Sequence, residues 1–458
     1  GVSITSTISD KTYGDANFTV TATKTASDDG TWNWTSSDDT VLKIVSDANS
    51  ATATVQVLKA SATGATLTVT YDSATHTGSA TTAIIKVNPK DVTITGLSAS
   101  NKEYDRSDTA TPTGTAVIDG KVGSDDVTVT AGTASFDNKN VGTSKTVTFS
   151  GYALGGTAAG NYTLSAQPAN ATADITAKEV TITGVTATNR DYAEGNVNVT
   201  VGGSVTVNGA ISGDDVTVDM AHAMGTMANA NAGNNKSVIV TGCALGGADK
   251  DNYKLKEQPT GVTVTINKIT WTNTSATGSA KYGTSGSVDL SSYLAPGGHF
   301  GTITKTDSEN VISGDPSMDG NTLKFTFVND ASKAGKTATI SVPVTDATNY
   351  NNYTITVTVT VNNKTTPTVT APTAKAGLVY NGADQVLINT GSTTGGTLQY
   401  SLTSGSGYSP ELPKAENAGN YIVYYKVIGN DDYADVAENS ISVSVAKRTI
   451  SVKADNKS

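Results

Sequence analysis

Three histidines are the first residues to examine, because histidine is the side chain most often used for proton transfer near neutral pH. They are His76, His222 and His299, and they lie in three different segments of the 458-residue chain without matching counterparts. Neither a G-x-S-x-G nor an H-E-x-x-H pattern occurs, and "GGTAAG" at Gly155 lacks the lysine of a phosphate-binding loop. We therefore predict no catalytic residue, no cofactor-binding residue and no enzymatic activity.

The single cysteine and the paired aspartates are the remaining candidates for reactive or metal-binding groups. Cys243 excludes a disulfide within one chain, and we expect a strand residue in a partly buried position rather than a reactive thiol. Adjacent aspartates occur at residues 28–29, 38–39, 125–126, 214–215 and 431–432. Calcium needs about six to eight oxygen ligands, and neighbouring strand residues point to opposite faces. We therefore favour aspartates that cap backbone turns and predict no metal site. Calcium bound at short junctions between domains is the alternative.

Exposed aromatic rings would indicate a carbohydrate site, and the tryptophans are the strongest candidates. Trp32 and Trp34 are two residues apart on one predicted strand and so share a face, whereas Trp271 lies far away in sequence. We favour an inward face that makes the first two part of a domain core.

Strands are the elements that must position all of these residues. Runs that alternate β-branched with small residues end in a lysine and lead directly into another such run. This happens around Lys90, Lys178 and Lys268, at intervals of 88 and 90 residues, and again at Lys364 and Lys447. No stretch of ten or more residues shows a convincing apolar period of 3.6. The pattern predicts an all-β chain, namely a tandem array of five immunoglobulin-like β-sandwich domains that forms an elongated rod.

The junction lysines set the expected domain boundaries. The five domains span residues 1–90, 91–178, 179–268, 269–364 and 365–447, and residues 448–458 resemble the truncated start of a sixth repeat. In that last segment Asn456 and Lys457 correspond to Asn101 and Lys102. Without partner strands we expect it to be largely disordered or opportunistically paired.

Tyrosine recurs at two positions of the repeat. One follows the opening strand, at Tyr13, Tyr104, Tyr192, Tyr282 and Tyr380. The other belongs to the pairs Asn161–Tyr162, Asn252–Tyr253, Asn352–Tyr353 and Asp432–Tyr433, and the first two pairs lie in the matching frames "GYALGGTAAGNYTL" and "GCALGGADKDNYKL". We predict that the Asn caps a turn and that the Tyr ring lies in its own domain core with its hydroxyl on nearby backbone. Each domain would thus close its own corner.

Composition and charge narrow the classes of partner. The formal net charge is -10 with no basic stripe, which argues against nucleic acid and anionic membranes. No apolar run approaches the ~20 residues of a membrane span, so we expect no membrane insertion in this fragment.

The second and third domains resemble the YDG domain of bacterial surface proteins and filamentous-haemagglutinin-like adhesins. The resemblance rests on "YDRSD" at Tyr104, "GDDVTV" at Gly213 and the two long frames, although Arg106 stands where a strict pattern has Gly. The first domain, with "WNWTSSDDTVLKI" from Trp32, is similar to group-2 bacterial immunoglobulin-like domains. The last two resemble MBG-type repeats.

These resemblances imply an extracellular protein, at the cell surface or secreted. We expect a monomeric, non-enzymatic stalk or spacer region of a bacterial adhesin that presents a distal binding or catalytic module. The alternative is a glycan- or matrix-binding module with a loop site in one divergent repeat. An extracellular ligand, protein or glycan, is possible in either case, and no cofactor is expected.

Overall fold

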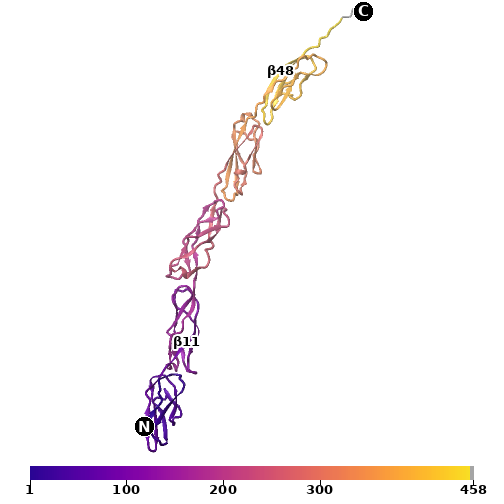
Figure 1. Cartoon of the computed structure of the whole chain (residues 1–458). Coiled ribbons are helices and arrows are strands. Elements are labelled where there is room, and N and C mark those ends of the chain that lie inside the picture. Colours follow the sequence, from indigo (N-terminus) through magenta and orange to yellow (C-terminus); the bar gives the residue numbers. More distant parts are fainter. Residues whose placement is uncertain (454–458) are drawn as a thin grey trace, which may run out of the picture. The chain divides into compact units, whose positions relative to one another are not determined.

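The computed structural model describes residues 1–453, and almost all of their regular structure is β. Within these residues four short 3-10 turns are the only helical segments: η1 Ala159–Asn161, η2 Lys250–Asn252, η3 Ser291–Tyr293 and η4 Ala331–Lys333. Figure 1 shows the strands gathered in β-sandwiches, and each sandwich is formed by one continuous part of the sequence, as its colour shows. The prediction of tandem immunoglobulin-like β-sandwiches is confirmed. We call the five predicted segments repeats 1 to 5.

Repeat 1 has three sheets with strand orders β1-β3-β6-β5, β2-β10-β7 and β4-β8-β9. Its strands are β1 Val2–Ile4, β2 Lys11–Thr12, β3 Phe18–Lys24, β4 Gly30–Ser36, β5 Leu42–Ser46, β6 Thr52–Val57, β7 Ser61–Ala65, β8 Leu67–Ser73, β9 Thr77–Thr81 and β10 Ile85–Asn88.

Repeat 2 has the sheets β13-β11-β18, β12-β19-β16-β15 and β14-β17. Its strands are β11 Lys90–Ala99, β12 Lys102–Glu103, β13 Pro112–Asp119, β14 Thr128–Thr130, β15 Thr133–Phe136, β16 Gly142–Ser150, β17 Ala153–Gly155, β18 Tyr162–Leu164 and β19 Ala171–Thr176.

Repeat 3 has the sheets β25-β20-β30, β22-β31-β28-β27-β23, β21-β24 and β26-β29. Its strands are β20 Lys178–Thr183, β21 Thr186–Ala187, β22 Arg190–Asp191, β23 Asn198–Val199, β24 Val201–Gly202, β25 Thr206–Asn208, β26 Thr217–Asp219, β27 Met224–Met227, β28 Gly233–Thr241, β29 Ala244–Gly246, β30 Tyr253–Leu255 and β31 Thr263–Asn267.

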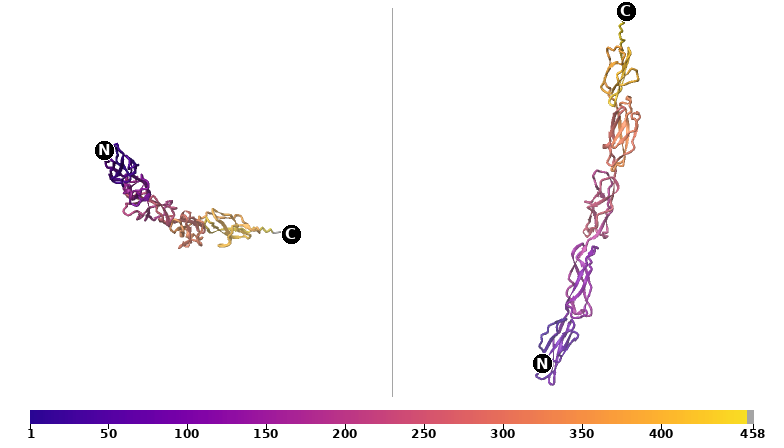
Figure 2. Two further views of the ribbon diagram at one scale, coloured as in Figure 1. Left: turned by 90° about the horizontal axis from the view of Figure 1, so that it is seen from below. Right: turned by 90° about the vertical axis from the view of Figure 1, so that its right-hand side faces the viewer.

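Repeat 4 has a sheet of β32-β39-β38-β34, in which β35 also pairs with β38, and a sheet of β33-β37-β36. Its strands run lengthwise along the sandwich (Figure 2). They are β32 Ser275–Lys281, β33 Ser285–Asp289, β34 His299–Phe300, β35 Thr304–Thr306, β36 Ser317–Asp319, β37 Thr322–Thr326, β38 Thr337–Thr345 and β39 Tyr353–Asn362.

Repeat 5 combines the sheet β45-β47-β48 with three two-stranded pairs, β40-β44, β41-β43 and β42-β46. Its strands are β40 Val369–Thr370, β41 Thr373–Ala374, β42 Gln385–Val386, β43 Ile388–Asn389, β44 Ser392–Thr393, β45 Thr397–Ser401, β46 Lys414–Ala415, β47 Gly419–Ile428 and β48 Val436–Val445.

Alternation of β-branched residues explains why these segments are strands. In β39, Ile355, Val357 and Val359 are fully buried, while threonines between them occupy the other face. This period of two is what a sheet needs when it covers a core on one side only.

Contacts divide the chain into two compact units. The first contains Gly1–Ala187, Asn198–Thr226 and Val238–Val262, and the second contains Thr188–Val197, Met227–Ser237 and the residues from Thr263 onward. Repeats 1 and 2 lie in the first unit, repeats 4 and 5 lie in the second, and repeat 3 contributes to both.

Candidate functional site

The five tyrosines that follow the opening strand occupy one backbone position of the repeat. In each repeat the Tyr N–H donates to a carbonyl in or just after the last long strand, at 2.9–3.1 Å. The pairs are Tyr13 with Asn88, Tyr104 with Thr176, Tyr192 with Asn267, Tyr282 with Asn362, and Tyr380 with Ala446. A parallel bridge just before each tyrosine, such as β2 on β10 and β12 on β19, sets this position. We call these residues the opening tyrosines.

The duplicated frame of repeats 2 and 3 forms a loop that lies against the preceding repeat. In repeat 2, Gly156 has φ of +92°, and a Cβ there would lie 2.3 Å from the Asp126 carbonyl oxygen, so only glycine fits. Asp126 Oδ2 accepts hydrogen bonds from both the N–H and the hydroxyl of Thr157. The turn η1 then ends at Asn161, directly before Tyr162. Repeat 3 shows the same close approach of Gly247 to the backbone.

The asparagine at the end of this loop bonds to the preceding repeat. Asn161 Oδ1 accepts the N–H of Ala60 at 2.9 Å, and Asn252 Oδ1 accepts the N–H of Val141 at 2.9 Å. Neither side chain caps its own turn: in η1 and η2 the N-cap residues are Ala158 and Asp249, without a side-chain cap bond. The prediction of a local cap is therefore wrong: each side-chain oxygen accepts a backbone N–H of the preceding repeat instead, which would otherwise lack a partner there.

The following tyrosine meets the opening tyrosine of the preceding repeat on a shared carboxylate. Tyr13 and Tyr162 both donate to Asp125 Oδ2, at 2.7 and 2.5 Å, and their rings cross edge-on with centroids 5.4 Å apart. Tyr104 and Tyr253 repeat this arrangement on Asp214 Oδ2, at 3.0 and 2.6 Å and with a centroid distance of 5.5 Å. Edge-on aromatic pairs and hydrogen bonds to a charged acceptor both stabilise such contacts.

Asp214 is held as a buried carboxylate. Its side chain is 1% exposed, and burial acts to raise its pKa. Hydrogen bonds from Tyr253 and Tyr104 outweigh burial and lower the pKa. Arg106 contributes as well, since its Nε lies 3.0 Å from Asp214 Oδ1, but the N–H is not aligned for a hydrogen bond and this oxygen has none.

The tyrosines respond in the opposite direction. Burial and the hydrogen bond to Asp214 raise the pKa of Tyr253 to about 12, and burial with the bond to Asp125 does the same for Tyr13. Both hydroxyls therefore stay protonated and keep donating over the whole neutral range.

The expected corner role of Tyr162 and Tyr253 is only part of their function. Their hydroxyls do accept backbone N–H groups of their own repeats, Val122 at 2.9 Å and Ile211 at 3.0 Å. Tyr253 nevertheless packs in one apolar cluster with repeat 2 residues such as Ile94 and Phe149. The expectation that each repeat has a separate core is wrong for repeats 2 and 3.

In repeat 4 one Asn-Tyr pair contacts the preceding repeat, and the tyrosine of a neighbouring pair forms the corner. Asn349 Oδ1 accepts the N–H of Ala232 at 2.8 Å, and Tyr350 crosses Tyr192 edge-on at 5.9 Å. Tyr353 instead serves as the corner, accepting the N–H of Ala295 at 2.8 Å and donating to the Tyr293 carbonyl at 2.7 Å. The predicted pair Asn352–Tyr353 is thus displaced by three residues from the pair that contacts repeat 3. We call Asn161, Asn252 and Asn349 the junction asparagines.

Repeat 5 contacts repeat 4 by different chemistry. Lys281 of repeat 4 pairs with Asp432 Oδ1 of repeat 5 at 2.5 Å, and Ala434 of repeat 5 packs against the apolar cluster of repeat 4. Within repeat 5, the Thr365 N–H donates to the Asp432 carbonyl and the Ala434 N–H donates to the Thr365 carbonyl, which holds this loop beside Thr365. An ion pair with this exposure adds little free energy in water.

The three histidines and Cys243 do not lie together in one site. His76 bonds Asp28 Oδ2 at 3.1 Å on an exposed turn, and His222 and His299 are exposed elsewhere. Cys243 is fully buried and lies outside the strands, because Gly242 with φ of +78° ends β28. This corrects the expected strand position, and burial raises the pKa of its thiol.

The tryptophans lie in packed surroundings. Trp34 is buried in the repeat 1 core and donates to the Ser50 carbonyl at 3.0 Å, and Trp32 packs against the same core, as predicted. Trp271 crosses Tyr350 edge-on at 4.8 Å beside the contact with repeat 3.

The paired aspartates take separate partners. In two pairs the first member, Asp125 or Asp214, binds tyrosine hydroxyls, and the second, Asp126 or Asp215, accepts backbone N–H groups. Within residues 1–453 no three His, Cys, Asp or Glu side chains are grouped to hold a metal ion.

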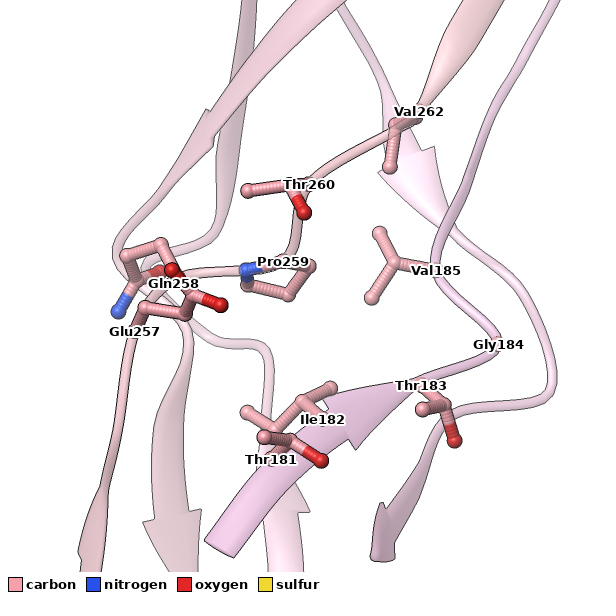
Figure 3. Close-up of a pocket in the computed structure, with 10 residues that line it drawn as sticks. All are labelled: Thr181, Ile182, Thr183, Gly184, Val185, Glu257, Gln258, Pro259, Thr260 and Val262. Atoms are coloured by element: carbon pink, nitrogen blue, oxygen red, sulfur yellow. The ribbon is translucent and has the colours of Figure 1, made fainter.

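A cavity of about 360 Å³ lies in repeat 3 between β20 and the loop of residues 257–262. Ile182 and Val185 line it from β20 and the segment that follows, and Pro259 and Val262 line it from the loop (Figure 3). Gln258 is held by two hydrogen bonds to the backbone of Cys243, so it is not free to contact a ligand. No histidine, cysteine or aspartate lines this space.

The fold and the junctions define a protein of tandem immunoglobulin-like β-sandwiches. Residues 88–171 and 176–261 each match the family model of the YDG domain. These matches fall on the two repeats in which the Tyr–Asp–Tyr contacts and the duplicated frame occur. No curated protein matches the chain.

Solved structures to which the chain shows similarity include multidomain immunoglobulin proteins. Sidekick-1 immunoglobulin domains 1-5 are 8% identical, with 98% of this chain and 99% of that chain covered and a TM-score of 0.23. The eight N-terminal domains of Down Syndrome Cell Adhesion Molecule are 13% identical, with 95% and 67% covered and a TM-score of 0.18. The fibronectin(III)-like modules of Clostridium thermocellum CbhA are 17% identical, with 40% and 96% covered and a TM-score of 0.18.

No helix among residues 1–453 is both long and apolar enough to cross a membrane.

Proposed function

We propose that the chain is a non-enzymatic spacer region of a bacterial surface adhesin, in which direct contacts between consecutive repeats restrict bending. In this proposal repeat 1 is a group-2 bacterial immunoglobulin-like domain, repeats 4 and 5 are MBG-type domains, and the protein acts outside the cell as a monomer.

One observation supports the spacer role above the others. Three junction asparagines bond the backbone of the preceding repeat, at Ala60, Val141 and Ala232, with distances of 2.8–2.9 Å. A contact repeated at successive junctions is expected of a chain selected for a fixed relation between neighbours, whereas a binding site needs to occur only once. The short connections, as at Lys90 and Lys178, add to this restriction.

Small-angle scattering tests the proposal. For the intact chain we expect a maximum dimension on the order of 150 to 200 Å, from strands of ~3.3 Å per residue in five successive sandwiches. The double variant Asn252→Ala, Tyr253→Ala should broaden the distribution of distances by freeing one junction. A compact globule for the intact chain would contradict a spacer.

A glycan- or matrix-binding module remains the alternative, and the cavity beside β20 in repeat 3 is the feature that favours it. Binding of one glycan class on an array, abolished by Pro259→Ala, would support that alternative instead.

A further inference from the structure

The end of repeat 5 carries an opening tyrosine that no other repeat covers within residues 1–453. Tyr380 is 38% exposed and its neighbour Val379 is 43% exposed, whereas Tyr104 and Tyr282 are buried. The Tyr380 N–H bonds Ala446 as in the other repeats, so the backbone position is the same. Its ring and hydroxyl contact no aromatic or hydrogen-bonding group among the described residues.

The same end of repeat 5 presents the backbone group that a junction asparagine binds. In repeats 2 and 3 the bonded N–H belongs to the middle residue of Asn140-Val141-Gly142 and Asn231-Ala232-Gly233. In both cases the side-chain amide of the incoming asparagine also donates to that first Asn, at 3.4 and 3.2 Å.

Repeat 5 contains this three-residue sequence as Asn417-Ala418-Gly419, with Asn417 exposed. Repeat 4 has Lys333-Ala334-Gly335 at the matching place, and its junction has an ion pair in place of a junction asparagine. Repeat 5 therefore has the Asn-x-Gly sequence whose middle N–H donates to a junction asparagine at repeats 2 and 3, and repeat 4 lacks its first asparagine.

A third feature lies in the segment after repeat 5. Arg448 stands two residues after Ala446, as Lys90 stands two residues after Asn88. In this register Ile450 and Val452 correspond to Val92 and Ile94.

The exposures of these matching residues differ widely. Val92 and Ile94 are 2% and 3% exposed in the repeat 2 sandwich, whereas Ile450 and Val452 are 83% and 90% exposed. The segment has the sequence of a core strand, and residues 1–453 contain no sheet to receive it. The predicted correspondence of Asn456 and Lys457 lies outside the described residues.

We infer that Tyr380, Asn417-Ala418-Gly419 and the strand-like segment Arg448–Lys453 form a docking surface for an immunoglobulin-like domain that presents an Asn-Tyr loop. This rests on the proposed function, because it assigns to repeat 5 the same mode of coupling. The Asn of the partner binds the Ala418 N–H and its Tyr covers the Tyr380 ring. The segment from Arg448 pairs into the partner's sheet and buries Ile450 and Val452 there.

Amide hydrogen exchange on a fusion tests the inference. Residues 96–178 are joined directly after Lys453, so that Ile450 and Val452 take the places of Val92 and Ile94 in the appended domain and a second copy of Asn161 and Tyr162 lies beside repeat 5. We expect exchange at Ala418 to slow at least ~10-fold relative to the unmodified chain. The matched control carries Asn161→Ala in the appended copy only, and there Ala418 should exchange as fast as in the unmodified chain. Tyr380→Ala in the fusion should also restore fast exchange.

Equal exchange at Ala418 in all of these proteins, with a folded appended domain, would overturn the inference. Failure of both this domain and an appended copy of residues 179–268 to fold would count against it equally. Val141 and Ala232 report on the proposed function separately: rapid exchange there would refute coupling by junction asparagines whatever happens at Ala418.

Discussion

The shared carboxylate between repeats 2 and 3 allows the coupling between them to be measured. Tyr253→Phe removes the donor 2.6 Å from Asp214 Oδ2 and leaves the Ile211 N–H without its acceptor. A hydrogen bond to a charged group contributes about 1.5 to 3 kcal/mol to stability. We therefore expect Tyr253→Phe to lower the free energy of unfolding by about 2 to 3 kcal/mol. Tyr104→Phe removes only the longer bond of 3.0 Å, and we expect about 1.5 kcal/mol.

The losses in free energy of unfolding caused by Tyr253→Phe and Tyr104→Phe should not be additive. Both hydroxyls serve one buried oxygen, so the double variant should depart from the sum of the single variants by about 1 kcal/mol. Native-state amide exchange gives the opening free energy of each repeat, read at Val147 in β16 and at Val240 in β28. Because the cluster around Tyr253 includes repeat 2 residues, Tyr253→Phe should lower the free energy at Val147 as well as at Val240.

Tyr152→Phe is the matched control. The Tyr152 ring is buried in repeat 2 against Phe149, and its hydroxyl has no hydrogen-bond partner among residues 1–453. We expect less than about 0.5 kcal/mol from this variant. Additive losses, or an effect of Tyr253→Phe confined to Val240, would refute the reasoning that the two repeats share stability.

Three further predictions address the same junctions. Asn252→Ala removes the acceptor of a partly buried N–H and should cost about 1 to 3 kcal/mol in thermal unfolding, whereas Asn170→Ala, on an exposed loop, should change little. Gly156→Ala should destabilise repeat 2 by more than about 1 kcal/mol, since its Cβ would meet the Asp126 carbonyl, and an unchanged melting temperature would disprove this. The pKa of Asp214 lies below its ordinary value of 3.8 in the folded chain, so its contribution is present above that pH and is lost as pH falls through the folded pKa. Acid titration of stability should show this loss in the native chain and not in Asp214→Asn.

The strands could be predicted from the sequence because their signal is local. The alternation in segments such as "TITVTVTV" of β39 fixes which residues are buried without reference to any other part of the chain. The lysine spacing likewise placed the tyrosines that begin each repeat in equivalent positions, as their common backbone bond confirms.

The partners of Asn161 and Asn252 could not be predicted in the same way. Their bonds reach backbone groups 101 and 111 residues away, and the sequence around Ala60 differs from that around Val141. An Asn before a strand is also a common turn residue, so local chemistry favoured the wrong partner. The duplicated frame was the available signal, since matching loops in consecutive domains indicate a role that each repeats at the boundary with its predecessor.

The shift from Asn352 to Asn349 has a related cause. Both residues precede a tyrosine, and only the three-dimensional placement of Ala232 and Tyr192 determines which pair faces repeat 3. Sequence spacing alone could not separate a corner tyrosine from a junction tyrosine when repeat 4 contains one of each.

The long sequence separation of the junction bonds also imposes an order on biosynthesis. Tyr13 belongs to the start of repeat 1, but Tyr162, which covers it, lies near the end of repeat 2. A growing polypeptide therefore completes the first sandwich well before residue 162 has emerged, and the ring of Tyr13 meets water throughout that interval. At ~5 to 20 residues per second, the roughly 70 residues between β11 and β18 correspond to several seconds. Repeats 2, 3 and 4 therefore each cover the opening tyrosine of the preceding repeat only after most of their own chain has been synthesised.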